Sequence, residues 1–252
     1  MAAIRHLERA PITEALVDFK VTLPGDFPAE KLGAVSDQLK SDYPNREEQN
    51  AFEAQFKLGG KGAPGPTPVT TRALGLRGYF FKSNDRLNVA QFRRDGFTFN
   101  RLAPYTRWED IRDEALRLWG LYREVAQPER LERVALRYIN KLAVPPRGPL
   151  ETYLSVTPPA IPGLPSHIGS FLMRLAAFDP ETHYLSNVTL ALEKDAADAI
   201  RSLIILDIEA YTATGLGLSA HELMPILERL HVMKNEIFFG CITEEAARRH
   251  GG

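Results

Sequence analysis

Cysteine is almost absent from this sequence of 252 residues, since Cys241 is the only one. A single thiol excludes an internal disulfide and is typical of proteins from a reducing compartment. Cys241 follows an apolar run at residues 237–239, so we interpret its side chain as a small buried hydrophobe and not as a nucleophile.

Long apolar runs are absent as well. No window approaches the ~18 uninterrupted apolar residues that a membrane-spanning helix needs. Residues 1–6 lack the apolar core of a secretory signal. We therefore expect a cytoplasmic protein that makes no contact with a membrane.

The chain has no large excess of either charge, because 31 Lys and Arg residues oppose 32 Asp and Glu residues. An apolar fraction of 44% provides a sizeable core and gives no reason to expect disorder. The charge is nevertheless uneven, since residues 72–141 carry 15 basic and 9 acidic side chains. This segment is either a surface that attracts anions or, as we favour, a set of cations that pair with the acidic residues of 142–252.

Apolar residues alternate with polar ones over much of the chain, which is the pattern of half-buried β-strands. The predicted strands are residues 14–23, 48–58, 70–81, 86–93, 97–102, 133–142, 169–178, 184–193 and 200–211. Asp95-Gly96 predicts a tight hairpin turn. The glycine- and proline-rich residues 59–68 predict an exposed loop.

Apolar residues at helical spacing predict two long helices, each of which starts with a capping box. The two boxes lie at residues 106–109 and 219–222. Pro128 ends the first helix, whereas Pro225 lies inside the second, where we expect a kink or a later start. The polar residues 244–252 are expected to fray. Shorter helical stretches are predicted at residues 28–40 and 150–154.

The order of these elements repeats along the chain. It predicts an α+β fold of two similar β-α-β-β-β(-β)-α halves, in which each antiparallel sheet is covered by its own long amphipathic helix. The halves are residues 1–128 and 129–252, either as two domains or as one continuous domain. We expect a ligand at the junction of the halves, because clefts between similar units commonly bind ligands.

A first group of candidate ligand-binding residues comprises Asn100, Arg101 and Tyr105. They lie where a predicted strand leads into the first long helix. The start of a helix offers free N–H groups and a partial positive charge to anions. The alternative is structural, with Asn100 and Arg101 stabilising the turn and Tyr105 in the core.

A second group lies on one predicted strand and comprises Arg133, Arg137 and Asn140. Arg133 and Arg137 are four residues apart and therefore share a face of that strand. Asp207 and Glu209 share a face of another strand. We favour an ion-pair network between the two strands over an anionic ligand.

The third group comprises His231, Lys234 and Asn235, which share one side of the second long helix. If that side faces the sheet, these polar groups need partners and mark a site. If it faces water, they carry no functional meaning.

Motifs for cofactors and metals are weak. Residues 215–220 fit the dinucleotide pattern G-x-G-x-x-A, but too little chain follows for the remaining βαβ units. His221-Glu222 resembles the start of a zinc-binding helix, yet Pro225 stands where the second ligand is needed. We therefore predict neither a cofactor nor a metal.

Four segments, residues 10–15, 96–108, 137–140 and 234–238, resemble the sporadically distributed family of uncharacterised bacterial proteins of about this length. They read APITEA, GFTFNRLAPYTRW, RYIN and KNEIF and are spread over nearly the whole chain. The family carries no established activity, cofactor or catalytic residue, so the resemblance implies no reaction. Its scattered distribution suggests an accessory role.

We favour a non-catalytic accessory protein that binds a protein partner or an anionic ligand at the junction of the halves. The first alternative is an enzyme for a small molecule or peptide, with Glu14, Asp207 or His231 as acid or base. The second alternative is nucleic-acid binding through an arginine-rich sheet face. It requires an affinity that falls steeply with salt, and acidic residues within the positive surface argue against it.

Overall fold

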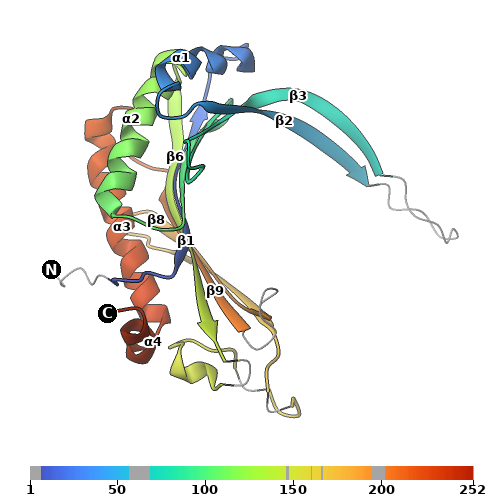
Figure 1. Cartoon of the computed structure of the whole chain (residues 1–252), viewed down its shortest axis with the longest axis vertical. Helices are drawn as coiled ribbons and strands as arrows, with labels where there is room; N and C mark the ends of the chain where they lie inside the picture. Colours follow the sequence, from blue (N-terminus) through green and yellow to red (C-terminus); the bar gives the residue numbers. More distant parts are fainter. Residues whose placement is uncertain are drawn as a thin grey trace, which may run out of the picture.

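The computed structural model describes residues 7–56, 69–145, 148–159, 161–165, 167–194 and 202–251. Its centre is a nine-stranded antiparallel sheet with the strand order β2-β3-β4-β5-β1-β6-β9-β8-β7 (Figure 1). The strands are β1 (Ile12–Thr22), β2 (Asn45–Phe56), β3 (Val69–Lys82), β4 (Asn88–Arg93), β5 (Gly96–Leu102), β6 (Arg130–Val144), β7 (Phe171–Phe178), β8 (Tyr184–Lys194) and β9 (Ser202–Thr212).

This single sheet shows that the prediction of two sheets, each with its own helix, is wrong. Strands β1 and β6 come from opposite sides of residue 128 and pair along their length, from Ile12 opposite Asn140 to Thr22 opposite Arg130. The hydrogen bonds between β1 and β6 join the strands of both halves, so neither strand is the edge of a separate sheet. The chain is α+β, as predicted, but the expected cleft between two sheets does not form.

The helices lie on one face of the sheet (Figure 1). Helix α2 (Trp108–Ala126) contacts β1 and β5, and helix α3 (Ala220–Cys241) contacts β6 and β9. The shorter helices are η1 (Ala29–Val35), α1 (Ser36–Leu39), η2 (Leu150–Thr152) and α4 (Glu244–Arg249). Among the described residues, none of the helices combines the length and the apolar character needed to cross a bilayer.

The alternation within the strands explains why the helices cover only one face. On β1, Val17 and Phe19 are fully buried beneath the helices, while Asp18 between them points to the open face. Phe19 packs against Trp119 of α2 with ring centroids 4.7 Å apart. The indole N–H of Trp119 donates a hydrogen bond to the carbonyl of Leu218, which links α2 to the start of α3.

The two predicted capping boxes have different outcomes. The box of α3 is confirmed, because the Ser219 hydroxyl accepts from the Glu222 N–H and the Glu222 carboxylate accepts from the Ser219 N–H. The box at Thr106 is wrong. Helix α2 begins one residue later, with Arg107 as its N-cap and no side-chain cap. Trp108 is thereby the first residue of α2 and is buried against α3 through a ring stack on His231.

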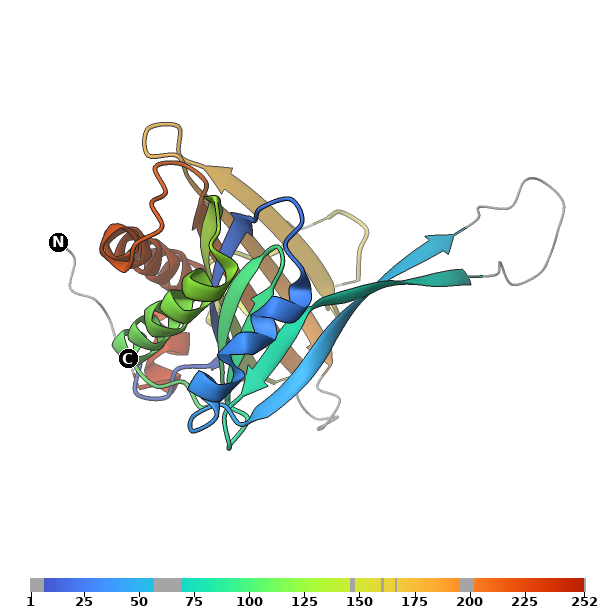
Figure 2. The same cartoon turned by 90° about the horizontal axis from the view of Figure 1, so that it is seen from above.

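Most of the polar segment that was expected to fray, residues 244–249, forms the helix α4. Thr243 caps α4 by accepting a hydrogen bond from the Ala246 N–H, and both Ala246 and Ala247 are buried. At the other extreme of the molecule, β2 and β3 extend beyond the sheet as a two-stranded arm (Figure 2). The predicted loop at 59–68 lies outside the described residues.

Candidate functional site

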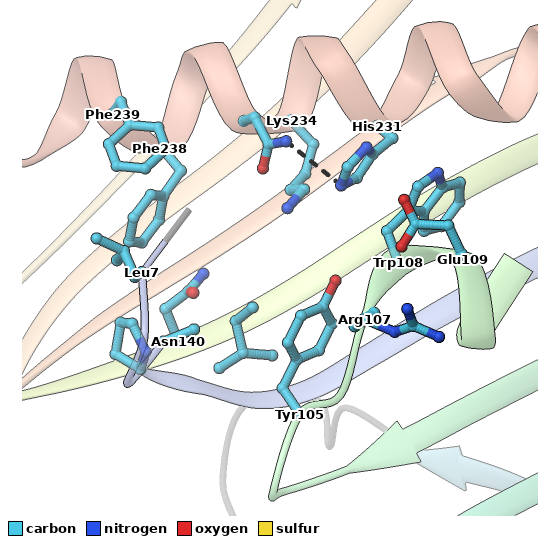
Figure 3. A pocket seen from close by; sticks show the side chains of 14 residues that line it. Leu7, Tyr105, Arg107, Trp108, Glu109, Asn140, His231, Lys234, Phe238 and Phe239 are labelled. Atoms are coloured by element: carbon cyan, nitrogen blue, oxygen red, sulfur yellow. Dashed lines mark hydrogen bonds between the residues drawn. The ribbon is translucent and has the colours of Figure 1, made fainter. Parts of the chain in front are cut away.

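A cavity of about 260 Å³ lies between α3 and the sheet (Figure 3). Four parts of the chain form it: the segment before β1, the connection from β5 to α2, strand β6 and helix α3. Its polar lining comprises Tyr105, Arg107, Glu109, Asn140, His231, Lys234 and Asn235. Its apolar lining includes Leu7, Ile12, Trp108, Phe238 and Phe239. Such an apolar wall with a few convergent polar groups is the usual composition of a small-molecule site.

Lys234 is the most unusual of these residues. Its side chain comes from the sheet-facing side of α3, and only 5% of the residue is exposed. The amino group points into the cavity (Figure 3) and lies 3.9 Å from the ring centroid of Tyr138. Within the described part of the chain it has no hydrogen-bond or ion-pair partner. Burial lowers its pKa to about 7, because the ammonium form loses its hydration.

His231 lies one turn before Lys234 and forms the wall toward α2. Its ring stacks on Trp108, with centroids 4.5 Å apart and planes 9° from parallel. Its Nε2 atom is 3.3 Å from the amide nitrogen of Asn235. Burial first, and then the charges of Lys234 and Arg112, lower the His231 pKa to about 3. The imidazole is therefore neutral at neutral pH.

Tyr105 faces Lys234 from the connection between β5 and α2. Its hydroxyl points toward α3 (Figure 3), and its ring meets that of Tyr138 edge-on at 5.9 Å. Burial raises the pKa of Tyr105 to about 12, so the hydroxyl keeps its proton and can donate a hydrogen bond.

Asn140 forms part of the floor of the cavity on β6 and is only 2% exposed. Its amide nitrogen donates to the backbone carbonyls of Leu206 and Tyr138, at 3.0 and 3.4 Å. Both partners are acceptors, so the orientation of the amide is fixed. Its oxygen accepts no hydrogen bond from the described residues and is available to a ligand.

The Tyr138 side chain lies beneath Lys234 and Tyr105. Its hydroxyl is buried and meets hydrogen-bond geometry with none of the described residues. The Tyr105 hydroxyl is close enough to contribute to the raised pKa of Tyr138, but the two hydroxyls do not meet the distance and angle of a full hydrogen bond. Burial is the main cause that raises the pKa of Tyr138 well above its ordinary value. The ring thus serves as a neutral aromatic platform for the Lys234 amine.

Five of the ten predicted site residues come together in this cavity, although they were assigned to three different groups. They are Tyr105, Asn140, His231, Lys234 and Asn235. The open question about the third group is also answered, because the side of α3 that carries it faces the sheet and buries His231 and Lys234.

The other five predicted residues lie outside the cavity. Arg137 pairs with Asp207 through two contacts of 2.9 and 2.6 Å, and Arg133 pairs with Glu209 at 2.6 Å. These four are on the open face of the sheet, where the favoured ion-pair network is confirmed.

Asn100 also lies on that open face, where its amide donates to Glu14 at 2.5 Å. Arg101 is at the end of β5 and donates to the Asn88 side chain and the Pro104 carbonyl. Arg101 thus has the turn-stabilising role of the alternative interpretation, whereas Asn100 bonds to the neighbouring strand and not to the turn.

The sequence interpretation missed Glu109 and the aromatic walls formed by Trp108, Phe238 and Phe239. One signal for the site was present. Lys234 follows Leu227 and Leu230 at helical spacing, so it continues the apolar stripe of α3. A cation inside such a stripe indicates a buried amine.

Searches against protein-family models, curated proteins and solved structures find no match to this chain. The family resemblance of the four segments therefore stays a prediction. All four segments nevertheless meet at the cavity: residues 10–15 supply Ile12, 96–108 supply Tyr105, 137–140 supply Asn140 and 234–238 supply Lys234.

Proposed function

We propose that the protein binds a small organic anion in the cavity between α3 and the sheet. The observation that carries this proposal is the buried Lys234 amine, which has no acidic partner among the described residues. A buried ammonium needs a counter-charge, and a ligand carboxylate supplies one. Arg107, the other cation of the lining, is a weaker candidate for binding the anion, because its side chain is 73% exposed and pairs with Asp110.

The remaining lining narrows the class of ligand. Tyr105 directs a hydroxyl donor into the cavity from the wall opposite Lys234, so both can hold one carboxylate through charge-assisted hydrogen bonds. Leu7, Phe238 and Phe239 form an apolar wall that suits a hydrocarbon body. A cavity of about 260 Å³ is larger than the ~150 Å³ that holds a benzene ring, so it admits a body of up to roughly ten carbon atoms.

The first test is calorimetric titration with a series of straight and branched carboxylates from acetate to octanoate, each paired with its neutral amide. We expect one chain length to bind best and its amide to bind at least about tenfold more weakly, equivalent to about 1.4 kcal/mol. Lys234→Met should abolish this preference. The matched control Lys141→Met, at an exposed position of β6, should leave it unchanged.

The pH dependence supplies a second readout. The carboxylate pairs with the ammonium form, whose population falls above the pKa of Lys234, about 7. We therefore expect the affinity to fall by about tenfold for each pH unit above that value. Equal binding of acid and amide, or binding that Lys234→Met does not change, would exclude the proposal.

Nucleic-acid binding receives less support from the geometry. The arginines of the open face, Arg93, Arg133 and Arg137, each pair with a carboxylate of the same face. Paired guanidinium groups release few counterions when they meet a phosphate backbone.

A further inference from the structure

The Lys234 amine differs in kind from the surface lysines of this chain. Lys82, for comparison, pairs with Glu47 at 2.6 Å at the sheet surface. Lys234 is surrounded by groups that are neutral at pH 7: Tyr138 and Asn140 on β6, Tyr105 on the connection to α2, and His231 and Asn235 on α3. The charged side chains that line the cavity are Glu109 and Arg107, both from the start of α2. Neither forms an ion pair with Lys234.

An amine in this position is chemically reactive for a physical reason. Only the neutral form has a free electron pair, and an ordinary lysine at pH 7 is almost entirely ammonium. The pKa of Lys234, about 7 against an ordinary 10.5, leaves about half of the side chains neutral at that pH. This is an increase of roughly three orders of magnitude in the nucleophilic form.

We propose that Lys234 is a nucleophile that forms an imine with an aldehyde or ketone admitted to the cavity. The proposal goes beyond anion binding, because it is a covalent step and requires no charge on the ligand. It uses three features of the geometry: an enclosed amine, a hydroxyl directed into the same space, and an apolar lining (Figure 3).

The step balances without any further reagent. The electron pair of Nζ attacks the carbonyl carbon, a C–N bond forms, and the π pair of the carbonyl moves to oxygen. A proton passes from nitrogen to that oxygen to give a carbinolamine. The C–O bond then breaks, the oxygen leaves as water with the second amine proton, and a C=N bond remains. One amine and one carbonyl group thus give one imine and one water, with no oxidation or reduction.

Two side chains of the cavity are placed to assist. The Tyr105 hydroxyl donates a hydrogen bond to the carbonyl oxygen and stabilises the negative charge that develops there. The Asn140 oxygen accepts from the hydroxyl of the carbinolamine. Because Leu7 and Phe238 are both buried apolar side chains of the lining, they keep bulk water from hydrolysing the imine.

The test is reductive trapping on the full chain. The protein is incubated with butanal and cyanoborohydride at pH 7, and butylated lysines are located and timed by peptide mass spectrometry. We expect Lys234 to be butylated at least about tenfold faster than the exposed Lys141, because about half of its amine is neutral at this pH. Equal or slower labelling of Lys234 in the wild-type protein overturns the proposal.

Two further measurements separate chemistry from folding. Between pH 6 and 9 the labelling rate of Lys234 should level off above a midpoint near 7, while that of Lys141 should keep rising. Tyr105→Phe should slow the labelling of Lys234 and leave that of Lys141 unchanged. A Lys234 profile that rises in parallel with that of Lys141 contradicts the proposal.

The two proposals about the cavity can fail separately. Carboxylate binding weakens above pH 7 and involves no covalent bond, whereas imine formation strengthens there and proceeds with an uncharged aldehyde. A protein that binds carboxylates but does not label at Lys234 retains the proposed function and loses the nucleophile. A protein that is labelled at Lys234 but binds no carboxylate retains the nucleophile and loses the proposed anion binding.

Discussion

At the scale of single residues, the Lys234 amine lowers the stability of the folded chain. The unfolded state binds a proton at Lys234 up to pH 10.5, whereas the folded state releases it above about 7. In this window the unfolded state holds more protons, so the free energy of unfolding rises with pH by up to about 1.4 kcal/mol per unit. Below pH 7 the full cost of the buried ammonium is present.

We therefore expect Lys234→Met to stabilise the protein at pH 6.5, by up to roughly 5 kcal/mol, which corresponds to the whole pKa shift of Lys234. The gain should shrink as the pH rises from 7 to 9, because the wild-type lysine becomes neutral in the folded state. Urea unfolding of both proteins at several pH values measures this difference. A gain that does not change with pH would show that the amine stays charged.

Tyr138 provides a second prediction at this scale. Its buried hydroxyl meets no hydrogen-bond partner among the described residues, and such a group costs about 1–3 kcal/mol. We expect Tyr138→Phe to leave the free energy of unfolding unchanged or to raise it by about 1 kcal/mol. A clear loss of stability in thermal unfolding would reveal a partner for the hydroxyl.

The direction of individual side chains could be predicted where the local period settles it. Alternation along β6 places Tyr138 and Asn140 on the buried face, and both are buried there. The orientation of α3 was harder to predict, because the neighbours Ile237 and Phe238 are equally apolar and the pattern does not show which of them is buried more deeply against the sheet. Phe238 is the buried one, and it brings Lys234 inward, four residues earlier on the same side.

At the scale of elements, the two capping boxes provide a matched pair of predictions. Ser219→Ala removes the hydroxyl that caps α3 and should destabilise the fold by about 1 kcal/mol. Thr106→Ala changes the same motif where no cap forms and should stay within about 0.5 kcal/mol of wild type. Denaturant midpoints check both, and equal effects would contradict the helix boundary at Arg107.

Sequence alone could not distinguish these two boxes. Both fit the S/T-x-x-E pattern, which satisfies the N–H groups of a helix that starts directly after the Ser or Thr. In α2 a tertiary contact decides otherwise. Trp108 stacks on His231, and its indole N–H donates to Glu228 of α3. We attribute the helix start at Trp108, one residue later than the pattern predicts, to this contact.

At the scale of the whole molecule, the pairing of β1 with β6 was not predictable from the order of elements. The paired residues, such as Val17 and Leu136, are more than a hundred positions apart. Local patterns show that a strand has a buried face but not which strand is its neighbour. The same element order is compatible with two sheets or one, and only the long-range ladder selects one.

The continuous sheet leads to a prediction about fragments. A cut after residue 128 separates β1 from β6 and divides a core in which Phe19 and Leu227 belong to the same cluster. We expect residues 1–128 and 129–252 each to lack cooperative unfolding when expressed alone. Circular dichroism during heating tests this, and a sharp transition in either fragment would establish an independent domain.

The position of α3 in the chain also determines when the cavity comes into existence during synthesis. The ribosome completes all nine strands before it reaches residues 220–241, which carry Lys234. Until that helix leaves the exit tunnel and docks, the nascent chain has the sheet side of the cavity but lacks the Lys234 amine. A small molecule held in this cavity therefore distinguishes a chain with α3 in place from every shorter intermediate on the ribosome.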